Sequence, residues 1–248
     1  MVGIPARARG FHRPILIAYE TIVQPGRWVR VAAALRAKPL PGRLMATPHL
    51  NVDELAQRHA AWTVAWHQGP TSPEAAPPWV AIERNHRMNF DLWHEEDMAR
   101  RDDLGAERVR QAKRLIDRCN QARNDAIEEL DVWLQGQLPA ASEDRPQHSE
   151  TPGMIIDRLS ILSLKLYHMR IEAGRDSAAE AHRRKCRERC GILETQLADL
   201  KACLASLLDE LVRGARRFKL YRQLKMYNDA ALNPQLYSAA RPDAAGGA

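Results

Sequence analysis

The sequence predicts an all-α fold, an antiparallel bundle of about five helices in which the long C-terminal helix carries a heptad pattern. Apolar residues recur at three- and four-residue steps through five separate segments, which is the period of a helix that buries one face. No segment alternates as a half-buried strand does, and glycine is scarce within the periodic segments. A chain of 248 residues is long enough to form one such domain with a substantial core.

The first three predicted helices are separated by Pro-rich or polar segments. A helix is predicted near residues 52–67, and the Pro-rich stretch at residues 68–78 ends it. The next two helices are predicted over residues 79–100 and 107–135, with the polar turn "RRDDLG" between them. The short turn makes these two helices antiparallel neighbours.

The fourth predicted helix follows the longest internal loop, residues 136–153. The loop closes on Thr151 with Pro152 after it, a capping residue followed by proline at the first helical position. Residues 154–173 are then apolar around most of the helix circumference, which indicates a helix packed on more than one side. We therefore expect this helix at the centre of the bundle.

The fifth predicted helix is long, from about residue 178 into the 220s, and carries a heptad seam. Such a seam is typical of antiparallel bundles and coiled coils, so a homodimer or a helical protein partner that packs on it is one alternative function. The sequence "YNDAALNP" ends the helix. The seam consists of Cys186, Cys190, Leu193, Leu197, Leu200, Leu204, Leu207 and Leu211, continued by Gly214, Phe218, Tyr221 and Lys225.

The two ends of the chain differ from the bundle domain, which we expect over residues 45–237. Residues 1–44 hold eight basic residues and one acidic residue. Their net charge of 8 − 1 = +7 exceeds the net charge of the whole chain, +6. Their apolar segment is interrupted by Glu20, so it makes a poor signal peptide, and the cytoplasm is the expected location. We interpret residues 1–44 as a disordered leader or an overlong start before Met45, and residues 238–248 as a disordered tail. Nucleic-acid binding through the leader is a third alternative function.

No apolar run approaches the roughly 18 residues that a membrane span needs. Glycine-rich phosphate loops, nucleophile elbows and redox motifs are also absent from the sequence. Neither a cofactor nor a metal site is predicted. A two-metal carboxylate site is the alternative we weighed, because Glu83 and His86 have the Glu-x-x-His spacing. They project away from the apolar stripe, however, as His94 and Asp97 largely do.

Polar side chains fall on the predicted core faces of the helices when each is projected at 100° per residue. The second helix places two amides and a carboxylate there, and the third repeats the pattern. The fourth and fifth helices add charges and a histidine. The candidate site residues on these faces are Asn85, Asn89, Trp93, Glu96, Asn120, Arg123, Asp157, His168, Arg222 and Lys225. Asn124 and Asp131 flank the face of the third helix, and Arg158 and Lys165 lie along the side of the fourth.

Several charged residues on core-facing positions are not expected in a core that serves stability alone. Leaving one ion of a buried pair without its partner costs about 3 to 5 kcal/mol, out of a net stability of about 5 to 15 kcal/mol. Two interpretations stay open. The residues form a hydrogen-bonded network that fixes the register of the helices, or they line a pocket between helices that binds a polar ligand.

Four phrases of the sequence resemble a known family. They are "NFDLWHEEDMAR", "IDRCNQARNDAIEELD", "SETPGMIIDRLSILSLKLYHMR" and "FKLYRQLKMYNDAALNPQLY". Together they resemble the bacterial domain-of-unknown-function family 4254 over residues 50–237. The family is uncharacterised, and its members are often encoded near glycosyltransferases of cell-surface polysaccharide assembly. The resemblance therefore implies a sugar or a nucleotide-activated sugar as ligand, and its phrases add Tyr227 and Asn228 to the candidate residues.

The functional hypothesis is a site between helices that binds or transforms a polar small molecule; whether the protein is an enzyme stays open. Glu96, Asp157 and His168 are the candidates for proton transfer. The amides and Arg123 would orient a ligand that carries hydroxyl or phosphate groups. Anions could also bind Arg222 and Lys225, or the free amides at the start of the fourth helix.

Overall fold

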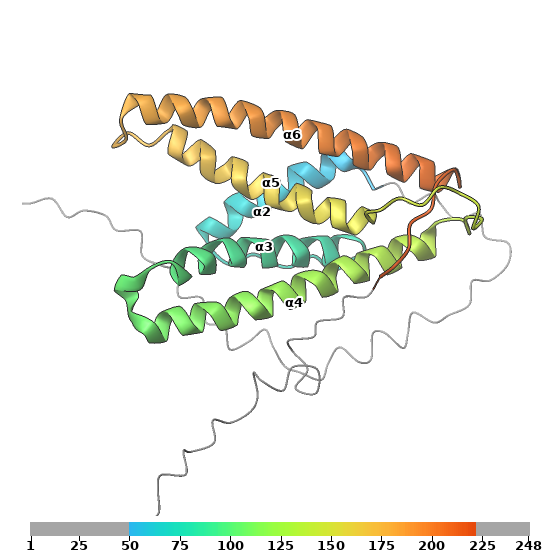
Figure 1. Ribbon diagram of the computed structural model, residues 1–248, viewed down its shortest axis with the longest axis horizontal. Coiled ribbons are helices and arrows are strands. Elements are labelled where there is room, and N and C mark those ends of the chain that lie inside the picture. The colour runs from blue at the N-terminus through green and yellow to red at the C-terminus, as the bar shows by residue number, and fades with distance from the viewer. Residues whose placement is uncertain (1–49, 222–248) are drawn as a thin grey trace, which may run out of the picture. The chain divides into compact units, whose positions relative to one another are not determined.

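The structure is a computed structural model that describes residues 50–221 (Figure 1). Over these residues it confirms the predicted all-α bundle, with five α-helices. Within the described range the only β-type pairing is an isolated bridge between Gln147 and Arg217. Four predicted site residues, Arg222, Lys225, Tyr227 and Asn228, lie outside it, as do the predicted leader and tail. The elements are α2 (Val52–Gln68), α3 (Trp79–Ala99), the short 3-10 helix η2 (Asp102–Leu104), α4 (Gly105–Gln137), α5 (Pro152–Ala173) and α6 (Glu180–Val212).

The bundle consists of two antiparallel hairpins and one further helix (Figure 1). Helices α3 and α4 pack along each other, and so do α5 and α6. Helix α2 contacts α3, α5 and α6. Helix α5 touches all four other helices, which confirms its predicted central position. No helix in the described range combines the length and apolarity needed to cross a membrane.

The start of α5 is held by a buried carboxylate from α4. Thr151 caps the helix as predicted, because its Oγ1 accepts a hydrogen bond from the Met154 amide at 3.2 Å. The same hydroxyl donates to Asp131, and the Gly153 amide donates to Asp131 Oδ1 at 2.7 Å. Asp131 therefore joins α4 to the positive end of α5. The first amides of α5 are thus occupied, which contradicts the prediction of a free anion site there.

We expect Gly153→Ala to lower the free energy of unfolding by about 1 to 3 kcal/mol. A Cβ at this position would meet the Asp131 carboxylate at 2.7 to 2.9 Å, so the capping contact must open. Gly191→Ala is the matched control, since a Cβ there meets nothing within 4 Å on the exposed face of α6. The control should stabilise the protein by about 0.5 to 1 kcal/mol. Chemical denaturation measures the free energy of unfolding of both variants. If the two substitutions changed it equally and in the same direction, the capping role of Asp131 would be contradicted.

Helix α6 ends earlier than the heptad pattern predicts, and the extension through Gly214, Phe218 and Tyr221 is wrong. Gly214 adopts φ +64°, its amide donates to the Leu211 carbonyl at 3.0 Å, and the Ala215 amide donates to the Glu210 carbonyl at 2.8 Å. This pair of bonds closes a helix with a left-handed glycine. Phe218 still reaches the core, but as part of an irregular segment.

The earlier part of the seam packs within the chain. Leu204 has no exposed surface, and Leu207 and Leu211 are buried with it in the main core. Leu200 is half-buried against the same core. The residues expected to support a homodimer are therefore covered by their own bundle. A homodimer or a helical partner stays a prediction, but this seam is not the surface on which it would pack.

Candidate functional site

Helix α3 is buried on more than one face, contrary to the single core-facing stripe predicted for it. It packs against α2, α4 and α5, so residues all around its circumference lose contact with water. Glu83 and His86, expected to point away from the core, are 8% and 0% exposed. The buried residues are Ala81, Ile82, Glu83, Asn85, His86, Asn89, Phe90, Asp91, Leu92 and Glu95.

The predicted inward position of Glu96 is wrong. Its side chain is 44% exposed and pairs with Arg100 one turn later, in the last turn of α3. The neighbouring Glu95 is the buried acid, and it receives hydrogen bonds from both Nη atoms of Arg108 on α4. The predicted stripe places Glu96 wrongly because α3 has two buried faces here. Asn85 and Asn89 face α5, whereas Glu95 faces α4.

Asp157 of α5 collects the polar residues that the sequence predicted to face inward. Its Oδ1 accepts hydrogen bonds from the side-chain amides of Asn85 and Asn89, both at 2.9 Å. Arg123 of α4 lies beside the same oxygen, with Nε at 3.6 Å. Arg123 also donates a long hydrogen bond, 3.5 Å, to Asn89 Oδ1. Residues from α3, α4 and α5 thus meet at one buried carboxylate, and we call these four residues the Asp157 cluster.

A directed chain of hydrogen bonds runs from the Asp157 cluster to α2. The Thr63 hydroxyl donates to the His59 carbonyl at 2.8 Å, so it can only accept from His86 Nε2 at 2.9 Å. His86 Nε2 therefore carries the proton, and His86 Nδ1 accepts from the Ser160 hydroxyl at 2.7 Å. Ser160 in turn accepts from Asn89 at 3.0 Å. The partners identify a neutral His86 that links α2, α3 and α5.

Two histidines of this region are buried in the neutral form. Burial lowers the pKa of His59 to about 3 and that of His86 well below its usual value. The rings stack with centroids 4.5 Å apart. Neither ring nitrogen of His59 has a hydrogen-bond partner in the described part of the chain. His59 is therefore an uncommon, unpaired polar residue within the core.

The Asp157 cluster also contains polar atoms without hydrogen bonds. Asn85 Oδ1 and Arg123 Nε are buried and lack hydrogen-bond partners among residues 50–221. The Arg123 side chain is 26% exposed and that of Asp157 is 11% exposed, so Arg123 is the more exposed member of the ion pair. Buried polar atoms normally have partners, so these two are exceptions within the cluster.

Within residues 50–221, no hydrogen bond or ion pair joins the remaining predicted site residues to the Asp157 cluster. Arg158 is exposed and pairs with Glu150, and Lys165 is exposed. The sequence predicted both along the side of this helix. Although α5 is central, it leaves that narrow face to solvent, so Lys165 is not an inward base. Asp131 caps α5, as described above. Asn120, Asn124 and Trp93 are half-buried.

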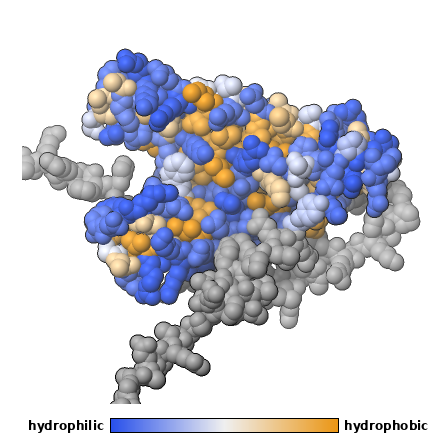
Figure 2. All heavy atoms as spheres, viewed as in Figure 1, coloured by the Kyte–Doolittle hydropathy of each residue, from blue (hydrophilic) through white to orange (hydrophobic). Residues whose placement is uncertain are grey.

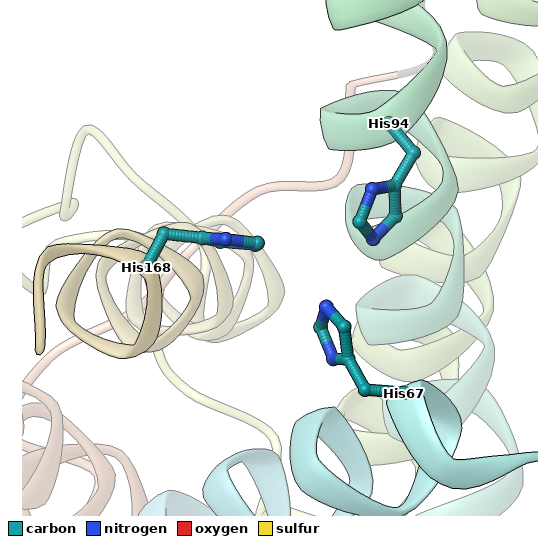
Figure 3. A group of neighbouring side chains, drawn as sticks. All are labelled: His67, His94 and His168. Carbon is teal, nitrogen blue, oxygen red and sulfur yellow. The ribbon is translucent and has the colours of Figure 1, made fainter. Parts of the chain in front are cut away.

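Three histidines form a second group that the sequence did not predict. His67 of α2, His94 of α3 and His168 of α5 point toward one another (Figure 3). One ring nitrogen from each lies within 4.8 Å of the other two. All three are half-buried, and burial is the largest cause of a lowered pKa for His94 and for His168, whose pKa is about 4. The prediction that His94 lies off the core side missed this group.

The three histidines lie near one end of the bundle. Each occupies the last two turns of its helix, and α2, α3 and α5 all run toward that end (Figure 1). On the face viewed in Figure 2, the surface is notched there between the α3–α4 and α5–α6 hairpins. A groove of about 500 Å³ lies at the opposite end, lined by residues such as Leu138, Leu211 and Phe218. It contains none of the predicted site residues.

The fold and these two groups define a class of protein, an α-helical bundle with a buried polar cluster and a three-histidine cluster between its helices. The family model described as "Protein of unknown function (DUF4254)" matches residues 79–220. The chain belongs to this family, as the resemblance indicated. No curated protein and no solved structure matches the chain.

Proposed function

We propose that the protein binds a polar small molecule at the Asp157 cluster. The observation that carries this proposal is the pair of buried polar atoms without hydrogen bonds in the cluster, Asn85 Oδ1 and Arg123 Nε. Leaving Asn85 Oδ1 unpaired costs about 1 to 3 kcal/mol, whereas Arg123 Nε keeps an ion pair with Asp157 at 3.6 Å without a hydrogen bond. A ligand that supplies one donor and one acceptor recovers that free energy on binding.

The chemistry of the two atoms sets the class of ligand. Asn85 Oδ1 accepts a hydrogen bond, as from a sugar hydroxyl, and the guanidinium of Arg123 donates to an anionic oxygen of a phosphate or carboxylate. Asp157 keeps a second carboxylate oxygen to accept a further hydroxyl. A sugar or its nucleotide-activated form offers both kinds of group. The tie to cell-surface glycan assembly that the family resemblance implies supports the same class.

The proposal is tested by thermal unfolding of the full chain with nucleotide sugars, sugar phosphates and free sugars. A ligand present at 100 times its Kd should stabilise the folded protein by about 2.7 kcal/mol. Arg123→Gln should abolish the stabilisation by phosphate-bearing ligands. Arg158→Gln is the control, since Arg158 is a surface arginine paired with Glu150, and it should leave the stabilisation unchanged.

A fixed helix register is the second candidate role of the same residues. The chain of hydrogen bonds from Asp157 through Ser160 and His86 to Thr63 favours it, because it joins three helices in one arrangement. In that case none of these ligands would stabilise the wild type. If a ligand stabilised the wild type and Arg123→Gln equally, it would bind at a site other than the Asp157 cluster.

A further inference from the structure

We propose that His67, His94 and His168 bind one divalent transition-metal ion of the zinc class. The inference goes beyond the proposed function and rests on other residues, so either can hold without the other. The three rings come from three different helices and converge on one point (Figure 3). Packing of aromatic rings alone gives no reason for three ring nitrogens to converge.

The separation of the ring nitrogens suits an ion after a small closure. Zinc binds imidazole nitrogen at about 2.0 to 2.1 Å, so three nitrogens around one tetrahedral ion lie roughly 3.4 Å apart. In the structure they lie within 4.8 Å of one another. The required movement is of the order of 1 Å, within reach of side chains that are half-buried near helix ends.

Neighbouring groups orient two of the histidine rings and leave a ring nitrogen of each without a hydrogen-bond partner in the described residues. His67 Nδ1 lies 2.7 Å from the Thr63 carbonyl, which can only accept, so Nδ1 carries the proton and Nε2 keeps its lone pair. Such a bond from the second nitrogen orients metal-binding histidines in general. His168 Nε2 is buried without a hydrogen-bond partner in the described residues. Its ring is held flat against Trp93, with centroids 4.5 Å apart and an angle of 2° between the planes.

The donor set indicates which metals fit. Three imidazoles, with neither thiolate nor carboxylate among the grouped residues, suit Zn²⁺, Co²⁺, Ni²⁺ and Cu²⁺ better than Mg²⁺ or Ca²⁺, which prefer oxygen. Three protein ligands leave at least one coordination position for water or a ligand, as in catalytic rather than structural zinc sites. The site would then present a metal-bound water whose pKa lies near 7.

The first test is a titration of the metal-free, tag-free full chain with Co²⁺ and then Zn²⁺. We expect one equivalent of Co²⁺ to bind with the visible absorption of a nitrogen-ligated, four- or five-coordinate ion, and Zn²⁺ to displace it. A thiolate charge-transfer band would instead place the ion at a cysteine, such as Cys186, whose sulfur lies 3.4 Å from His182, and would overturn the proposal. The absence of stoichiometric binding would overturn it as well. Both results are read from the wild type, so they hold even where a variant fails to fold.

The second test uses single substitutions, with folding checked by circular dichroism. His94→Gln and His168→Gln should each weaken Zn²⁺ binding on the order of 100-fold or more, since loss of an outer-shell partner alone costs 10- to 100-fold. His182→Gln is the control and should bind Zn²⁺ as the wild type does, because His182 pairs with Glu172 at the start of α6. Loss of binding in His182→Gln with retention in folded His168→Gln would contradict the assignment. Sugar and nucleotide-sugar binding at Arg123 is measured separately, so failure of one proposal does not decide the other.

Discussion

Asp157→Leu is expected to lower the free energy of unfolding by about 3 kcal/mol. The leucine removes the acceptor of two buried amide groups and leaves the Arg123 guanidinium without its carboxylate. Asn89 keeps its bond to Ser160, whereas Asn85 loses its only hydrogen bond in the described part of the chain. The 26% exposure of Arg123 weakens its ionic contribution, so we take the lower end of the range for broken buried pairs.

Asp157→Asn separates the hydrogen bonds from the charge. It retains an oxygen for Asn85 and Asn89 and removes only the negative charge beside Arg123. We therefore expect a loss of about 1 kcal/mol. Asp125→Ala, at an exposed position of α4, is the control and should change stability by less than about 0.5 kcal/mol. Urea denaturation measures all three variants.

The outcome for Asp157→Leu also bears on function. A variant that folds and equals or exceeds the wild type in stability would contradict the expected loss. It would also show that the carboxylate is kept against stability, as at many binding sites. The expected loss leaves both roles of the Asp157 cluster open, and the ligand experiments with Arg123→Gln then decide between them.

Local signals in the sequence were sufficient for most of the fold. The Thr151–Pro152 start of α5 and the central place of α5 followed from a cap and from apolar residues around the helix. The end of α6 did not follow, because two signals conflict there. The heptad pattern continues through Phe218 and Tyr221, whereas Gly214 closes the helix by a left-handed cap. A glycine at a seam position is better interpreted as a terminator.

The candidate site was predictable where one helix face meets one neighbour. Asn85 and Asn89 share such a face of α3, Asp157 lies on the facing side of α5, and the structure brings all three together with Arg123. The projection failed for Glu96 because it assumes that a helix buries one stripe along its whole length. Helix α3 has three neighbouring helices, so burial follows the position of each neighbour and not the apolar period.

The three-histidine cluster could not be found by spacing, since its members lie on three different helices. One signal was present in the sequence. His67, His94 and His168 each fall in the last two turns of a predicted helix, so they lie at one end of the bundle if those helices run in the same direction. The direction of α2 is the missing information, because a connection through the Pro-rich residues 68–78 does not determine it.

The pH dependence of folding should change when His59 is replaced by phenylalanine. The pKa of His59 is about 3 in the folded protein and near 6.5 in the unfolded chain, so the unfolded chain binds the proton first as the pH falls. The stability that comes from a neutral His59 is present above pH 6.5 and is lost as the pH falls below it. Between pH 7 and pH 5 this loss is about 2 kcal/mol.

Other buried groups act over the same pH range, which is why the comparison with the variant matters. His86 adds a loss of the same sign. Burial raises the pKa of Asp91 and Asp131 to about 6, so these carboxyls bind protons first in the folded state and add stability as the pH falls through 6. The wild-type profile is the sum of these opposing effects. The difference between wild type and His59→Phe isolates the single imidazole.

We expect His59→Phe to equal or exceed the wild type in stability at pH 7, since His59 makes no side-chain hydrogen bond within residues 50–221 and phenylalanine keeps the stack on His86. At pH 5 the advantage of the variant should grow by about 2 kcal/mol. Urea denaturation from pH 7 to pH 5 measures the difference, with His59→Leu as a second variant in case the larger ring strains the core. If the free energies of unfolding of wild type and variant changed in parallel with pH, His59 would gain a proton in the folded protein as readily as in the unfolded chain. The burial of the His59 ring away from water would then be wrong.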